Sequence, residues 1–349
     1  MRDHHVYVSH DAAAPGRHRP RGLPAALVAV ALCGSFAAAP EAQAVTAAQT
    51  APTGASAAHP SRPNVFPGLR RNLVASYDFE HPAPGNAAKE RDQGRSGTDI
   101  DLVNGGGSMR VRDGAHPGSG TSLQTRQINP TLSGNDDWKA GTYSETGVNT
   151  LSAFNQAKQA TIMGWFKTTG QNPGLNSNTS APDDRYNAVG LAGVLTGTSQ
   201  GHDVRALLEV INVSGELRVV ALGRRVDGGK SQTFAANEDW QSVLPPDEWV
   251  FLTATFDFDE GTMALYKNGR PLDGAYTLTD DPWEVAGAPE PDLTSATDPR
   301  GIKIGGSFPQ NTQEQNPCDC RLDDLMFLDR AVTGKEVLQQ YRWATKNHP

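Results

Sequence analysis

From Leu73 to its end, the chain consists of short segments with alternating apolar and polar residues, separated by turns rich in Gly, Asn and Pro. Alternation with a period of two is typical of β-strands. The clearest pair is Thr262–Lys267 and Arg270–Leu272, joined by Asn268-Gly269, a dipeptide that fits a type I′ hairpin turn. Strands do not alternate with helices along the chain, so the pattern predicts an antiparallel sandwich or barrel rather than a parallel sheet.

Further strands are expected at seven places. The segment Trp249–Asp257 carries apolar residues on both faces, which predicts a central strand. A single helix is expected near the end, where Thr333-Gly334-Lys335-Glu336 forms a capping box ahead of an apolar face. The seven expected strands are Leu73–Phe79, Gln159–Lys167, Arg205–Asn212, Glu216–Leu222, Trp249–Asp257, Gly301–Gly305 and Leu322–Leu328.

Composition agrees with a chain of many turns. The 349 residues include 36 Gly and 24 Pro, both above average usage. The formal net charge is −8, and such a surface disfavours nucleic acid or an anionic membrane as the main partner.

The N-terminus has the three parts of a secretory signal peptide. Three arginines, Arg17, Arg19 and Arg21, precede the apolar run Leu23–Ala39, and Ala42-Gln43-Ala44 is a small-x-small cleavage site. The run is short and Ala-rich for a membrane span. We therefore predict a signal peptide over residues 1–44, a flexible Ala/Pro/Thr/Ser linker over 45–68 and one domain over 69–349, with the protein secreted to the extracellular space.

Two cysteines remain after cleavage, Cys318 and Cys320. An exported protein favours an oxidised pair. The spacing closes a tight ring, however, and disulfide geometry is demanding. A disulfide and two free thiols both stay open.

Seven ordered landmarks resemble the LamG-like jelly-roll domains of the concanavalin A-like lectin/glucanase superfamily, and they span about residues 70–345. Phe251 stands where the family usually has His, and the stretches 105–155, 171–200, 227–247 and 275–300 are long for the family. The landmarks are Tyr77-Asp78-Phe79-Glu80, Asp92-Gln93-Gly94-Arg95-Ser96-Gly97, Ala160–Lys167, Trp249–Asp257, Leu265–Gly269, Ile302–Gly305 and Leu322–Val332.

The resemblance implies an all-β, two-sheet antiparallel jelly-roll sandwich with about six or seven strands in each sheet and one short C-terminal helix. It also implies binding of carbohydrate or protein on a concave face or loop rim, and in many members a calcium ion. Catalytic members of the superfamily are glycoside hydrolases and polysaccharide lyases.

Catalysis has some candidate residues. The segment Lys139-Ala140-Gly141-Thr142-Tyr143 matches a motif of alginate-lyase-like jelly rolls, and Tyr143, His202 and Lys139 are the candidates for a lyase, which needs a general base. A retaining hydrolase needs two carboxylates about 5 Å apart. Strand alternation places Asp323 with Leu325 and Asp324 with Met326 on opposite faces, which argues against such a pair.

Calcium has candidate ligands in four acidic residues: Asp92, Asp99, Asp323 and Asp324. Exported β-sandwiches supply hard oxygen ligands from such side chains, and a site here would tie the first strand to the last. The alternative is that these aspartates form turns or accept hydrogen bonds from buried amides.

Sugar binding needs aromatic rings that face outward beside polar groups. Four candidates lie in the long insertions, near Asn and Asp residues: Trp138, Tyr143, Trp240 and Trp283. The alternative is that they anchor their loops. The sequence therefore predicts a secreted, lectin-like protein whose partner is a glycan or cell-surface polysaccharide, with calcium as the candidate ion. The alternatives are a protein partner, a polysaccharide lyase or glycoside hydrolase with a non-standard site, or a structural or adhesive module without a small ligand.

Overall fold

The computed structural model describes residues 64–127, 137–144, 147–154, 157–170, 189–195, 204–224, 231–277, 300–306 and 318–346. These belong to one compact unit, Pro60–Pro349. The predicted signal peptide lies outside the described residues, as does the linker up to residue 63. Val65, in the last part of the predicted linker, is only 2% exposed, so packed structure begins before residue 69.

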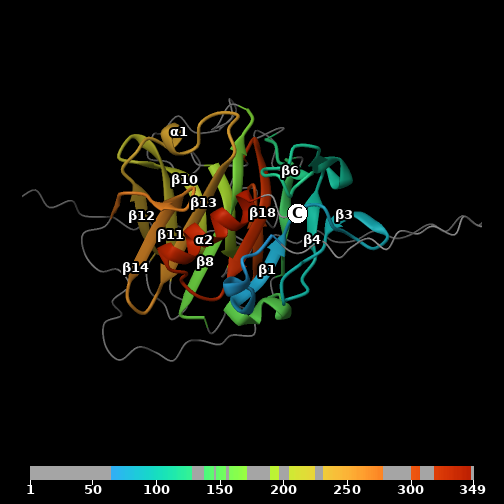
Figure 1. Ribbon diagram of the computed structural model, residues 1–349, viewed down its shortest axis with the longest axis horizontal. Helices are drawn as coiled ribbons and strands as arrows, with labels where there is room; N and C mark the ends of the chain where they lie inside the picture. Colours follow the sequence, from blue (N-terminus) through green and yellow to red (C-terminus); the bar gives the residue numbers. More distant parts are fainter. Residues whose placement is uncertain are drawn as a thin grey trace, which may run out of the picture. The chain divides into compact units, whose positions relative to one another are not determined.

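The described strands form two antiparallel sheets (Figure 1). The eight-stranded sheet has the order β15-β14-β13-β8-β18-β6-β5, with β1 paired to β18. Its strands are β1 (Leu73–Tyr77), β5 (Arg110–Val111), β6 (Ser122–Gln124), β8 (Gln159–Thr168), β13 (Val250–Asp257), β14 (Thr262–Lys267), β15 (Arg270–Pro271) and β18 (Cys320–Leu328).

The ten-stranded sheet has the order β16-β12-β11-β10-β9-β17-β7-β4-β3-β2. Its strands are β2 (Pro82–Ala83), β3 (Asn86–Glu90), β4 (Ile100–Val103), β7 (Lys139–Tyr143), β9 (Val189–Leu195), β10 (Val204–Val213), β11 (Glu216–Arg224), β12 (Ser231–Ala236), β16 (Gly274–Tyr276) and β17 (Gly301–Ile304). The predicted all-β sandwich of two antiparallel sheets with one short C-terminal helix is confirmed.

The main core lies between the sheets. Phe166, Leu252 and Phe327 of the smaller sheet belong to one buried apolar cluster with Val194 and Leu208 of the larger sheet. Apolar side chains in such a cluster each contribute about 1.5–3 kcal/mol when fully buried. The alternating strands of the sequence are therefore strands that share this core with a facing sheet.

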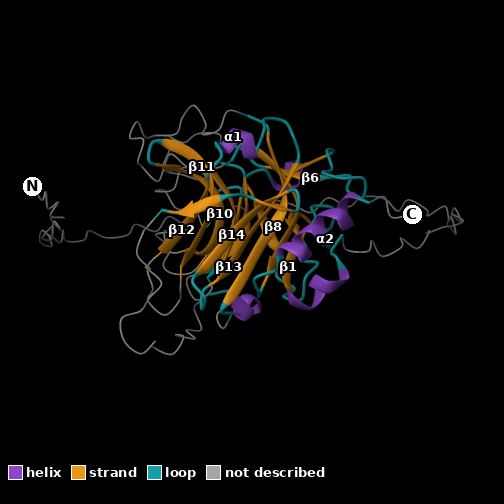
Figure 2. Ribbon diagram, turned by 60° about the vertical axis from the view of Figure 1, so that its left-hand side comes forward, coloured by secondary structure: helices purple, strands orange, loops and turns teal. Residues whose placement is uncertain are grey.

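A second apolar cluster covers the outer face of the smaller sheet. Helix α2 (Gly334–Thr345) places Val337 and Ala344 there, in a cluster with Trp165 and Phe251. Figures 1 and 2 show α2 lying against the strands of this sheet. The predicted capping box is present, with Thr333 and Glu336 each accepting a hydrogen bond from the other's backbone amide. The remaining helices are α1 (Trp240–Val243) and the 3-10 segments η1 (Pro67–Asn72), η2 (Gly106–Met109) and η3 (Asn149–Phe154).

The hairpin predicted from Asn268-Gly269 joins β14 to β15. Both turn residues have positive φ, 52° at Asn268 and 79° at Gly269, as a type I′ turn requires. The strand Val250–Asp257 lies between β8 and β14, which confirms it as a central strand.

The structure pairs Cys318 with Cys320 in a disulfide. Both cysteines are fully buried, and Thr125 donates its hydroxyl to the carbonyl of Cys318 at 2.6 Å. Of the two alternatives left open by the sequence, the structure has the bonded form.

The sheets hold more strands than the six or seven that the resemblance implies. The extra strands include β7, β9 and β12, which lie in the stretches that looked like long insertions. Every residue of β9 is buried, so its sequence VGLAGVL is apolar throughout and lacks the alternation that marks a half-buried strand.

Candidate functional site

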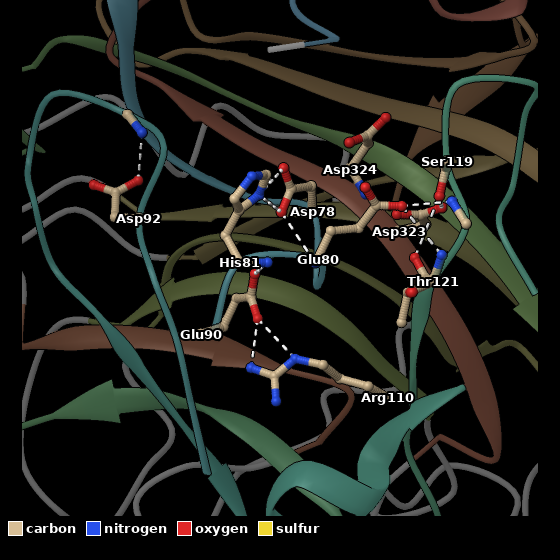
Figure 3. A network of polar contacts seen from close by, with 12 residues as sticks. Asp78, Glu80, His81, Glu90, Asp92, Arg110, Ser119, Thr121, Asp323 and Asp324 are labelled. Carbon is tan, nitrogen blue, oxygen red and sulfur yellow. Dashed lines mark hydrogen bonds and ion pairs between the residues drawn. The ribbon is translucent and has the colours of Figure 1, made fainter. Parts of the chain in front are cut away.

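Acidic side chains gather where β1, β3 and β18 end or bend (Figure 3). The chain turns sharply after β1, because Phe79 has a φ of 59° and lies in the left-handed region that a bulky residue rarely adopts. Its ring is fully buried. This conformation of Phe79 costs about 1–3 kcal/mol elsewhere in proteins, and it sets the turn between Asp78 and Glu80.

A β-bulge in β18 changes the predicted faces of Asp323 and Asp324. The register with β8 slips between Asp323 and Met326, and Asp324 has a φ of 44°. Leu322 and Leu325 consequently both face the core between the sheets, so Asp323 lies on the opposite face, with Met326. The simple alternation of the sequence analysis, which put Asp323 with Leu325, is wrong here because it assumed a strand without a bulge.

Both aspartates hold the loop between β5 and β6. Asp323 Oδ2 accepts hydrogen bonds from the Ala115 amide at 2.9 Å and the Ser119 hydroxyl at 2.6 Å. Asp324 Oδ2 lies 2.5 Å from His116 Nε2. Burial, and then the charge of Asp324, raise the pKa of Asp323 well above its usual value. This pair therefore ties a loop to the last strand.

Glu80 binds the same loop from the other side. Its Oε1 accepts hydrogen bonds from the Gly120 amide at 2.5 Å and the Thr121 amide at 3.2 Å. The loop is thus fixed to the end of β1 as well as to β18. Hydrogen bonds between protein groups therefore join the first and last strands through this loop.

The four acids expected to bind calcium form two groups. Asp92 accepts hydrogen bonds from the amides of Ser76 at 2.8 Å and Gly94 at 2.6 Å, and Asp99 accepts one from the Asp92 amide at 3.3 Å. Asp323 and Asp324 face the loop described above. Calcium prefers six to eight oxygen ligands. Donors of the protein bind both carboxylate oxygens of Asp92 and of Asp323, and calcium binding at the four acids stays a prediction.

Glu90, at the end of β3, is completely buried. Its Oε2 accepts hydrogen bonds from Arg110 Nε at 3.0 Å and Nη2 at 2.6 Å, while Oε1 accepts one from the His81 amide at 2.9 Å. Burial outweighs the Arg110 hydrogen bonds and raises the pKa of Glu90 to about 7. Asp78, His81 and Glu90 were not candidates from the sequence, because only the β2–β3 hairpin brings Glu90 back to His81.

The lyase candidates do not form a group within the described residues. Lys139 and Tyr143 are the two ends of β7, about 13 Å apart along an extended strand. Lys139 is 3% exposed, and Tyr143 packs beside Leu195 and Leu207. His202 lies outside the described residues.

The predicted sugar-binding aromatics differ in how deeply they are buried. Trp240 is 6% exposed and belongs to the main core, where the sequence analysis expected an outward ring. Trp240 begins α1, a single turn whose start is capped by the Asp239 side chain. Trp138 is partly buried, with the Arg126 guanidinium 4.7 Å from its ring centre. Trp283 lies outside the described residues.

A pocket of about 370 Å³ lies at the β16 edge of the larger sheet. Its lining includes Tyr276, Thr277, Asn237, Arg218 and Glu216. Tyr276 is the exposed large hydrophobic residue of the described chain, at 38%. Its ring is held in place by Phe234, against which it packs edge-on with 5.3 Å between the ring centres.

Hydrogen bonds fix the polar wall of this pocket. The Met263 amide donates to Tyr276 Oη at 2.8 Å. Arg218 pairs with Glu216 and donates to the Asn237 carbonyl. Tyr276 lies in one of the predicted insertions but was not a candidate from the sequence, because its place at the sheet edge depends on the pairing of β16 with β12.

A second pocket, of about 630 Å³, is lined by charged residues without an aromatic ring. Two ion pairs cross it, Arg95–Asp329 at 2.5 Å and Lys158–Asp259 at 3.2 Å. Unlike the first pocket, this one offers no aromatic ring against which a sugar could stack.

Comparison with known proteins leaves the family open. No family model matches the chain, and no curated protein matches it. Among solved structures, the chain is similar to a botulinum neurotoxin type G receptor-binding domain, at 12% identity and a TM-score of 0.44, over 78% of this chain and 51% of that one. A botulinum neurotoxin DC binding domain in complex with rat synaptotagmin II has 10% identity and a TM-score of 0.47, over 78% and 52%.

A Trypanosoma rangeli sialidase has 11% identity and a TM-score of 0.44, over 78% of this chain and 32% of the sialidase. The chain spans about half of the neurotoxin domains and about a third of the sialidase. Likeness at this level carries no argument about activity. Within the described residues, no helix is both long and apolar enough to cross a membrane.

Proposed function

We propose that this protein is a secreted, LamG-like glycan-binding domain that holds a sugar in the pocket beside Tyr276. The observation that carries the proposal is the pocket itself: an exposed aromatic ring, fixed by Phe234, next to polar groups of Arg218 and Glu216. A sugar ring presents an apolar C–H face and a rim of hydroxyls, so an aromatic face with polar neighbours suits it. The LamG-like landmarks of the sequence support the same class of ligand.

The pocket also suits such a ligand in size and charge. Its volume of about 370 Å³ lies within the range of about 300–1,000 Å³ that is common for small-molecule sites. Arg218 offers a fork of donors, and Glu216, whose side chain is 67% exposed, offers acceptors. Because the two charges balance, we expect neutral hydroxyl-rich glycans to bind in preference to acidic ones.

The test is a glycan array followed by calorimetric titration of the best oligosaccharide. We expect Tyr276→Ala to weaken binding about ten-fold, a loss of about 1.4 kcal/mol. Glu216→Gln, at an exposed position, should weaken it without affecting the fold. Lys158→Ala, in the other pocket, is the matched control and should bind like the unchanged protein. The proposal would be overturned if no neutral or acidic glycan bound, or if Tyr276→Ala bound the oligosaccharide as tightly as the unchanged protein.

Calcium dependence and cleavage remain predictions, and the same titrations test them. Repeating each titration in EDTA and then in excess calcium tests calcium dependence. A loss of glycan affinity in EDTA that excess calcium restores would support it, and identical binding curves would exclude it. Measuring the chain length of the polysaccharide after incubation with the protein tests cleavage, which would shorten the chains.

A further inference from the structure

The β2–β3 hairpin brings three metal-ligating side chains together, away from the sugar pocket. Asp78 and His81 precede β2, and Glu90 ends β3. Pro82 and Glu90 are partners in the hairpin, so Glu90 returns beside His81 (Figure 3). One ligand atom from each of Asp78, His81 and Glu90 lies within 4.8 Å of the other two.

The contacts aim these atoms at one another. His81 Nδ1 lies 2.8 Å from Asp78 Oδ2 and 2.9 Å from Oδ1. Glu90 Oε1 accepts the His81 backbone amide at 2.9 Å, which holds this oxygen on the His81 side. The hydrogen bond to the Asp78 carboxylate requires a proton on Nδ1, so a metal ion would replace this proton, and the imidazole would then carry its proton on Nε2.

Arg110 orients Glu90 from behind. It binds only Oε2 of that carboxylate, and it also donates to the Lys89 carbonyl at 2.8 Å, so its own position is fixed. Partners of this kind set the direction of a ligating side chain. With Glu90 ionised, the three side chains Asp78, Glu90 and Arg110 sum to one negative charge, which a cation would compensate.

The cluster is open on one side. Glu90 is completely buried, whereas the side chains of His81 and Asp78 are 22% and 19% exposed. An ion can therefore enter from solvent past His81 and keep a water molecule as a further ligand. A site with three protein ligands and one open position is common for zinc.

We propose that Asp78, His81 and Glu90 form a binding site for a divalent transition metal, with Zn²⁺ as the best fit. One imidazole nitrogen and two carboxylate oxygens are ligands that zinc accepts at about 2.0–2.2 Å. Ligand atoms around such an ion lie about 3.3–3.6 Å apart, so shifts of about 1 Å complete the site. Calcium fits less well, because it prefers six or more oxygen ligands.

The test uses the full chain, dialysed against a chelator and titrated with ZnCl₂ in a calorimeter. We expect one saturable site that His81→Ala abolishes. Asp78→Asn, which keeps the size of the side chain, should weaken it at least about ten-fold. Asp101→Asn is the control, since Asp101 pairs with Lys89 on the neighbouring strand and lies outside the cluster.

A comparison between variants and one further measurement keep the result specific. Other histidines of the chain can also bind zinc, so only the difference between the unchanged protein and the variants counts. Co²⁺ in place of Zn²⁺ should give visible absorption bands that His81→Ala removes and Tyr276→Ala retains. Equal Zn²⁺ affinity in the unchanged protein, His81→Ala and Asp78→Asn would overturn the proposal, as would an unchanged protein with no saturable site.

Discussion

At the scale of single residues, buried acids organise the end of the sandwich where the first and last strands lie together. Glu90 is paired with Arg110 and Asp324 with His116, and Asp323 accepts hydrogen bonds from two amides and a hydroxyl. A buried carboxylate without partners would cost several kcal/mol. The sequence pointed to Asp323 and Asp324, but not to their partners, because those depend on a loop more than 200 positions earlier.

Glu336 gives a prediction for acid stability. Two hydrogen bonds from Arg330, at 2.9 and 2.6 Å, and the capping contacts with Thr333 lower the pKa of Glu336 from 4.5 to about 2. A carboxylate with a depressed pKa stabilises the fold above its unfolded pKa, and this contribution is lost as the pH falls from about 4.5 through 2.

The expected result for Glu336→Gln is a loss of about 1 kcal/mol in the free energy of unfolding near pH 6. The difference from the unchanged protein should shrink steadily towards pH 3. Urea unfolding at a series of pH values measures it. A difference that stays constant with pH would mean that the charge of Glu336 is not what stabilises the helix start.

At the scale of elements, the alternating strands could be predicted and the continuously apolar ones could not. Val250–Asp257 and Thr262–Lys267 lie where the pattern placed them. The strand β9 was missed because both of its faces are buried. The pocket beside Tyr276 was missed for a related reason: it needs β16 at the edge of the sheet, and that pairing with β12 is not visible in local sequence.

The β14–β15 turn gives a prediction about packing against α2. A Cβ on Gly269 would lie 2.9 Å from Leu338 Cδ1 and 3.0 Å from Leu338 Cα, and the φ of +79° already disfavours other residues. We expect Gly269→Ala to lower the free energy of unfolding by about 1–3 kcal/mol.

Gly215→Ala is its matched control. Gly215 also has a positive φ, +93°, but nothing lies within 4 Å of a Cβ there. The control should therefore show the cost of the backbone alone, and Gly269→Ala should cost more in chemical denaturation. Equal losses would contradict close packing of α2 on the turn.

At the scale of the whole molecule, Pro60–Pro349 is one compact unit that contains both sheets. We propose that residues 1–44 are a signal peptide that serves export. Expressed with its full sequence in a secreting host, the protein should be recovered outside the cells with Val45 as its first residue, as N-terminal sequencing would show. Replacing Ala42 and Ala44 with arginine should block cleavage. Uncleaved protein retained inside the cells would contradict the export prediction.

The central claim is that this sandwich holds a glycan at the β16 edge of its larger sheet. The most direct measurement is an NMR titration of isotope-labelled protein with the oligosaccharide that binds best on the array. We expect saturable shifts in the backbone signals of four residues that line the pocket, Tyr276, Thr277, Asn237 and Arg218. Shifts that instead gather at Trp138 and Tyr143, or no saturable shifts at all, would contradict it.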